Sequence, residues 1–102
     1  MARILKSDAE KLLGNVADEY VFRCCDGSVF RSMRELYDGL ATMSGESFTF
    51  HAGEDKNDFS QWVQDIIRDE KLARDLRKSS GQTQAARGVR TRIDFLSDKL
   101  MQ

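Results

Sequence analysis

The chain has 102 residues, of which 40% are hydrophobic and 32% charged; its formal net charge is −1 and it contains no proline. A chain of this size can bury a core without a metal or disulfide framework, and its composition excludes wholesale disorder. No apolar run approaches the roughly 18 residues of a membrane span, and no signal-like stretch follows the first residues. We therefore expect one small domain over residues 1–102, with no membrane partner and a cytoplasmic location.

Four elements are predicted in the first half of the chain. Ser7 to Glu10 forms a capping box ahead of an apolar pattern that runs to Val16, which predicts a short helix weakened or ended at Gly14. In residues 20–30, side chains on the two faces of a strand alternate up to Asp26-Gly27, which is a favoured two-residue hairpin turn. This pattern predicts a short β-hairpin. A second capping box at Ser32 begins a predicted helix over about residues 33–42. Ser44 caps a further turn, with Phe48 and Phe50 as its apolar anchors.

The second half of the chain is predicted to be helical. Asn57 and Asp58 are good N-caps for a helix whose apolar face comprises Phe59, Trp62, Val63, Ile66 and Ile67. Asp69 caps the next helix, and the chain breaks at residues 79–81. The C-terminal helix, residues 82–102, carries a stripe of Ala86, Val89, Ile93, Leu96 and Leu100 that docks on its own domain or forms an intermolecular seam. The fold class expected is mainly α (α+β), with about five short helices and one small β-hairpin.

The spacing of the two cysteines favours neither a metal site nor a disulfide. Cys24 and Cys25 are neighbours, and on a strand their side chains would point to opposite faces. A zinc site of recurring spacing needs about four ligands, whereas this sequence supplies one adjacent pair and a single histidine, His51. We predict no bound metal, no cofactor and no disulfide between the two cysteines.

Charge is distributed unevenly along the chain. Residues 1–70 contain 8 basic and 14 acidic side chains, whereas residues 71–102 contain 8 basic and 3 acidic ones. A basic C-terminal segment is typical of a surface that meets nucleic acid or another polyanion, but it also pairs with acidic groups of its own fold or of a protein partner. The near-zero total charge favours the second interpretation.

No catalytic motif is evident. His51 could serve as a base for either cysteine, oriented by Asp55 or Asp58, but no local motif supports that arrangement. We expect instead that one ring nitrogen of His51 meets a carbonyl or carboxylate and helps to hold the loop before the long helix. Phosphate-binding glycine patterns are also missing from the sequence. The prediction is a protein that is not an enzyme.

Residues 20–78 combine an Asp-Gly turn, the pattern S-x-x-E-L-x-x-x-L, the pattern M-S-x-x-x-F, a histidine at position 51, and N-D-F-x-x-W-V followed by L-A-x-x-L. This combination resembles an uncharacterised prokaryotic domain family found mainly in archaea. The pattern V-x-x-R-I-x-x-L at residues 89–96 adds to it, whereas Ala52 and Gly53 depart from the family pattern. The family implies no known activity. The resemblance implies only that His51, Asn57, Asp58 and Trp62 form a structural or binding signature.

These observations favour a small non-catalytic protein-interaction or regulatory module. The expected contact surface is a seam between the acidic loop at residues 54–58 and the basic helices beyond residue 71, and reversing Arg87, Arg90 and Arg92 to glutamate should weaken partner capture without changing the melting curve. The alternative is a nucleic-acid accessory protein that uses the basic C-terminal helices. The candidate binding residues are His51, Asn57, Asp58, Arg74, Arg77, Lys78, Arg87, Arg90 and Arg92.

Overall fold

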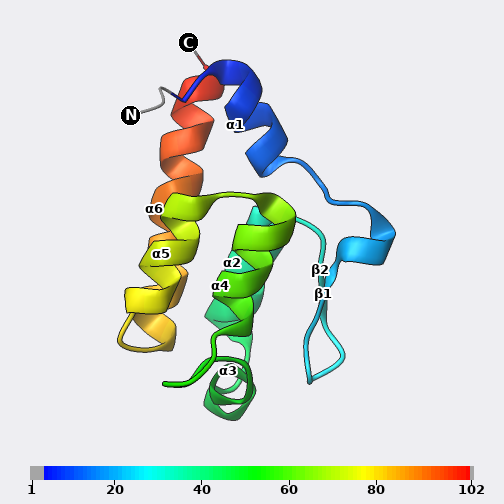
Figure 1. The fold of residues 1–102 in the computed structure, drawn as a ribbon, viewed down its shortest axis with the longest axis vertical. Helices are drawn as coiled ribbons and strands as arrows, with labels where there is room; N and C mark the ends of the chain where they lie inside the picture. Colours follow the sequence, from blue (N-terminus) through cyan, green and yellow to red (C-terminus); the bar gives the residue numbers. More distant parts are fainter. Residues whose placement is uncertain (1–3, 102) are drawn as a thin grey trace.

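A computed structural model describes residues 4–101 as a mainly helical protein with one small β-hairpin (Figure 1), which confirms the predicted fold class. Six α-helices are present in that part of the chain, where about five were predicted. The elements in chain order are α1 (Lys6–Leu13), the 3-10 turn η1 (Asp18–Tyr20), β1 (Phe22–Arg23), β2 (Val29–Phe30), α2 (Met33–Thr42), α3 (Gly45–His51), α4 (Asp58–Trp62), the π-helical turn η2 (Val63–Ile67), α5 (Glu70–Lys78) and α6 (Gln82–Leu100). None of the described helices is long and apolar enough to cross a membrane.

Helix α6 is the longest element, with 19 residues, and it packs against α1, α2 and α5 of its own chain (Figure 1). Val89, Ile93 and Leu96 are buried, as the predicted stripe requires. Ala86 and Leu100 of the predicted stripe are partly buried and pack against the core, and Ala85, which the prediction did not include, is buried as well. The C-terminal helix thus completes the core of its own chain.

The start of α1 differs from the prediction. Ser7 does not cap the helix, because the helix already begins at Lys6 and Asp8 Oδ2 accepts the backbone N–H of Leu5 at 3.0 Å. The helix ends at Leu13, and Val16 lies beyond it, where its N–H donates to the carbonyl of Arg31. Asp8, three residues after the N-cap Leu5, therefore makes the returning bond of the capping box that the sequence pattern assigned to Glu10, and no N-cap side chain accepts a hydrogen bond.

The hairpin turn is longer than predicted. Phe22 pairs with Phe30, and the N–H of Cys24 donates to Ser28 O at 2.9 Å, so three residues, 25–27, connect the arms. Gly27 N–H donates back to Cys24 O, and Gly27 has φ 93°, the left-handed conformation that a three-residue hairpin connection requires. Asp26-Gly27 forms part of this turn, but the expected two-residue turn was wrong.

Four helix caps agree with the sequence pattern. The side-chain oxygens of four cap residues each accept the backbone N–H three residues on: Ser32, Ser44, Asn57 and Asp69. Helix α2 occupies the predicted residues, 33–42. In α3, however, Phe48 is buried whereas Phe50 is 59% exposed, because residues two apart on a helix face different directions. Phe50 is not the core anchor that was predicted.

Aromatic rings join the hairpin to the helices. Phe22 of β1 stacks on Phe59 of α4 with 5.1 Å between ring centroids and meets Trp62 edge-on at 5.9 Å. Trp62 is 8% exposed and its Nε1–H donates to Tyr20 O at 2.7 Å, so the indole is buried with its polar atom satisfied. The aromatic cluster is thus part of the core, as its helical spacing predicted.

The predicted long helix after Asn57 has a wide final turn. Helix α4 continues as η2, whose Val63 carbonyl accepts N–H groups from both Arg68 and Asp69. Arg68 ends the segment with φ 71°, a left-handed conformation that is costly for any residue except glycine. The chain then turns directly into α5, which brings α5 beside α6.

Candidate functional site

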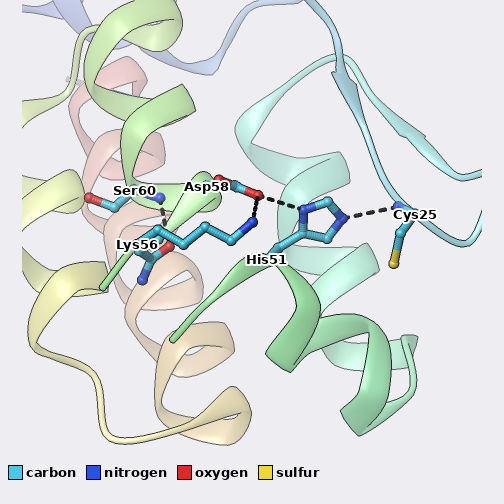
Figure 2. Close-up of polar contacts among 6 residues, drawn as sticks. Cys25, His51, Lys56, Asp58 and Ser60 are labelled. Carbon is cyan, nitrogen blue, oxygen red and sulfur yellow. Dashed lines mark hydrogen bonds and ion pairs between the residues drawn. The ribbon is translucent and has the colours of Figure 1, made fainter. Parts of the chain in front are cut away.

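His51 links three segments of the fold (Figure 2). It is the last residue of α3, is 6% exposed, and lies between the hairpin turn and the first turn of α4. Its Nε2 accepts the backbone N–H of Cys25 at 3.0 Å, and its Nδ1 lies 2.9 Å from Asp58 Oδ2. Because Nε2 accepts, the ring proton of the neutral imidazole is on Nδ1 and is donated to Asp58. His51 meets a carboxylate, as expected from the sequence, and also holds the hairpin turn.

Asp58 connects this histidine to the surface. Its Oδ2 also accepts from Lys56 Nζ at 3.1 Å, so the chain Cys25–His51–Asp58–Lys56 is continuous (Figure 2). Partial burial raises the pKa of Asp58, but the hydrogen bonds from His51 and Lys56 outweigh it and hold that pKa below its ordinary value. The carboxylate is therefore ionised at neutral pH and fixes the tautomer of the ring.

Asn57 caps α4 and connects it to α5 by hydrogen bonds. Its Oδ1 accepts the N–H of Ser60 at 3.0 Å, while its Nδ2 donates to Leu76 O at 3.3 Å near the end of α5. Ser60 adds a buried bond of 2.7 Å to Ala73 O. Both the oxygen and the nitrogen of the Asn57 amide are thus used within the fold, which accounts for Asn57 without a ligand.

An open groove of about 1600 Å³ runs between α5 and α6. Of the nine predicted binding residues, Arg74, Lys78, Arg87 and Arg92 line it. The first three are exposed and have no carboxylate within 4.0 Å among residues 4–101. From Gln84 to Phe95, α6 forms its wall over roughly 16 Å, at 1.5 Å per helical residue. The groove therefore gathers a part of the predicted basic surface in one concave place.

Two further cations in this groove were not predicted as site residues. Arg68 follows η2 in its left-handed conformation, and Lys71 lies in the first turn of α5. Ile4, Leu12 and the 42% exposed Phe95 supply apolar surface in the same groove. Phe95 lies off the predicted apolar stripe of α6, which is the one signal in the sequence that marks it as a surface aromatic.

Arg92 corrects the prediction of a uniform basic surface. It is 9% exposed, and its Nε donates to Asp69 Oδ2 at 2.7 Å and its Nη2 to Asp69 Oδ1 at 3.1 Å. Arg92 therefore belongs to a buried ion pair, and its reversal to glutamate would damage the fold. The expectation that the triple reversal of Arg87, Arg90 and Arg92 leaves the melting curve unchanged is wrong.

Arg77 and Arg90 lie outside the groove lining. Arg77 Nη1 donates to Ser60 Oγ and to Gln64 Oε1, at 3.1 and 2.9 Å. Arg90 pairs with Asp94 and lies over the ring of Tyr37. The seam expected between the acidic loop and the basic helices is not the groove, because no residue from 51 to 58 lines it. The loop does contact one of the predicted basic helices, because Asn57 Nδ2 donates to Leu76 O near the end of α5.

The hairpin turn brings the two cysteines to His51. The two Sγ atoms and a ring nitrogen of His51 lie within 4.8 Å of one another. Cys24 is buried and Cys25 exposed, and both are free thiols. Sequence spacing did not reveal this cluster, because 26 residues separate Cys25 from His51 and Cys25 belongs to the turn instead of a strand. The thiols and the imidazole are the donors in the described chain that could hold a soft metal ion.

Catalysis by a cysteine–histidine pair is not favoured by the ring's contacts. Both nitrogens of His51 already have partners, a backbone N–H and a carboxylate. A general base needs its free nitrogen directed at the proton it removes. In this arrangement His51 links the hairpin turn to α4 and has no free nitrogen to act as a general base. The absence of enzymatic activity stays a prediction.

Comparison with known proteins gave no match to a family model, to a curated protein or to a solved structure.

Proposed function

We propose that the protein is a small binding module that takes a short acidic, amphipathic segment of a partner protein into the groove between α5 and α6. The observation that carries the proposal is the groove's composition, in which exposed cations and apolar side chains line the same concave surface. Arg74, Lys78 and Arg87 have no carboxylate partner within 4.0 Å among the described residues, so they are available to acidic side chains. Phe95 supplies an exposed aromatic contact beside them.

The dimensions and the conformation of the groove support the same occupant. A wall of roughly 16 Å matches about three turns of a docked helix, which would present apolar side chains at i, i+3, i+4 and i+7. Arg68, which lines the groove, has a left-handed conformation that is strained for arginine, and strain of this kind is common at binding sites. Gly88 lies in the α6 wall, where a missing side chain allows a partner backbone to approach closely.

Nucleic acid is the second candidate, because the same exposed cations suit phosphate groups. Six cationic side chains line the groove, but four acidic ones line it as well. This small excess of positive charge favours a partner that offers both apolar and acidic side chains over a uniformly charged phosphate backbone. We expect the module to act in the cytoplasm, where the thiols of Cys24 and Cys25 stay reduced.

Selection from a random library of 18-residue peptides on the immobilised protein tests the proposal. Enriched peptides should combine acidic residues with apolar residues at helical spacing. Fluorescence anisotropy should then show that Arg74→Glu/Arg87→Glu weakens their binding at least tenfold, while the matched Arg23→Glu/Arg31→Glu variant, on exposed hairpin positions outside the groove, binds as the wild type does.

Two results would reject the peptide-binding proposal. The first is a selection that enriches basic peptides or that enriches no peptide at all. The other is tight binding of single- or double-stranded nucleic acid in place of peptides, with affinity that falls steeply as salt rises and is abolished by Arg74→Glu/Arg87→Glu, which would favour the second candidate.

A further inference from the structure

The hairpin turn places soft donor atoms around one side of His51. The Sγ atoms of Cys24 and Cys25 and a ring nitrogen of His51 all lie within 4.8 Å of one another. Sulfur and imidazole ligands bind a zinc ion at about 2.3 and 2.0–2.1 Å, so small side-chain rotations bring all three to a common ion. The geometry needed for coordination is therefore nearly in place.

The turn explains why two adjacent cysteines face the same point. Cys24 ends the first arm of the hairpin, since its N–H donates to Ser28 O, and Cys25 is the first residue of the three-residue connection. The alternation of a strand stops there, so the expectation of opposite faces does not hold for this pair. Gly27, with φ 93°, closes the turn that makes this possible.

The histidine is prepared as a ligand on the side of the cysteines. Asp58 accepts the Nδ1 proton, which leaves the lone pair of Nε2 directed at the turn, where it now accepts the N–H of Cys25 (Figure 2). Histidines that bind metals usually donate the N–H of their other ring nitrogen to a carboxylate, a backbone carbonyl or water, which fixes the tautomer and increases the basicity of the ligand. Lys56 holds the same carboxylate from the other side.

We propose that Cys24, Cys25 and His51 form a binding site for a thiophilic cation, with Zn²⁺ as the ion, and that Asp58 positions the histidine. Three protein ligands leave one corner of a tetrahedral ion open to water or to a donor from another molecule. Cys25 is exposed, so the ion has a path from solvent. The N–H of Cys25 competes for the lone pair of Nε2, which limits the affinity of the site.

Binding should release protons. A cysteine thiol has an ordinary pKa of about 8.5 and is therefore mostly protonated at neutral pH before the ion arrives. Coordination requires the thiolate, and the proton leaves to solvent. The number of protons released on adding Zn²⁺ at neutral pH therefore reports directly on thiol ligation.

The test is a titration of the whole, reduced, chelator-treated protein with Zn²⁺ in competition with a chromophoric chelator, with Cd²⁺ in parallel to detect thiolate-to-metal absorption. We expect one equivalent to bind, with proton release and a rise in the melting temperature. Cys25→Ser changes an exposed side chain and should abolish the Cd²⁺ absorption of the pair and the stoichiometric binding. His51→Gln should weaken binding as well, but it also removes a buried link, so its folding is checked by circular dichroism.

A matched pair of carboxylate variants separates the positioning role from general charge. Asp58→Asn should lower Zn²⁺ affinity by about 10–100-fold, as loss of such a hydrogen-bond partner commonly does. Asp55→Asn, at an exposed position three residues away in the same loop, should leave the affinity unchanged. The proposal is overturned if the wild type binds less than one equivalent, or if Cys25→Ser binds Zn²⁺ as tightly as the wild type.

Discussion

Arg92 holds Asp69 with two hydrogen bonds, from Nε at 2.7 Å and from Nη2 at 3.1 Å, and the exposed fractions of the two side chains are only 10% and 1%. The same carboxylate caps α5 by accepting the N–H of Leu72 at 3.1 Å. Arg92 lies on α6, so this one contact fixes the start of α5 against the longest helix of the fold. It also sets one wall of the groove against the other.

Arg92→Leu should lower the free energy of unfolding by about 3–5 kcal/mol, because it leaves the buried Asp69 without its compensating charge. Arg90→Leu is the matched control on the same helix. Its ion pair with Asp94 is exposed, so its loss should cost no more than about 1 kcal/mol. Urea unfolding followed by circular dichroism measures both, and equal losses would contradict the account of the buried pair.

Gly39→Ala should destabilise the protein by about 1–3 kcal/mol, although alanine favours helix formation. A Cβ at position 39 would lie 2.1 Å from Cζ of Phe30, because the ring packs directly on the backbone of α2. Gly88→Ala is the control, since a Cβ there meets nothing within 4 Å and should stabilise the helix by about 1 kcal/mol. Thermal unfolding of the two variants should shift in opposite directions, and a parallel gain in both would show that Phe30 does not require the glycine.

Asp58 should contribute to stability in a pH-dependent way. Burial raises its pKa, the bonds from His51 and Lys56 lower it further than burial raises it, and the net folded-state pKa is below the ordinary value. Its contribution is therefore complete above an ordinary aspartate pKa of about 3.9 and is lost as pH falls through the folded-state pKa.

Urea unfolding of the wild type and Asp58→Asn at about pH 5 and about pH 3 tests this, since the interval brackets the ordinary aspartate pKa. The wild type should lose more stability over this interval than the variant, while Asp55→Asn, which changes an exposed carboxylate, should follow the wild type. Parallel curves for the wild type and Asp58→Asn would show that the bonds to Asp58 do not stabilise the fold.

The positions of the helices could be predicted from local sequence patterns, whereas the candidate sites could not. Ser32, Asn57 and Asp69 are caps that act within three residues, so their roles were readable from the sequence. Arg92 is buried because it pairs with Asp69, 23 residues away in the sequence. No local pattern separates a buried arginine from its exposed neighbours on a basic helix. The Cys–His cluster was hidden for the same reason, together with an incorrect turn length.

Gly88→Leu should block the groove without weakening the fold. The position lies in the groove wall with open space around it, so a leucine side chain fills the groove instead of clashing with the core. We expect the melting temperature to rise or stay unchanged while anisotropy shows at least a tenfold loss of affinity for the selected acidic peptides. Retained affinity in a folded Gly88→Leu protein would locate peptide binding elsewhere.

A ¹H–¹⁵N correlation spectrum of the labelled protein, recorded during titration with a selected acidic peptide, tests the central proposal most directly. The largest shifts should fall on amides of the groove walls, around Arg74, Lys78, Arg87 and Phe95, and the hairpin around Arg23 should stay unchanged. Shifts confined to the hairpin or to the loop at residues 54–58, or no shifts at all with a peptide that binds, would contradict the assignment of the groove as the binding site.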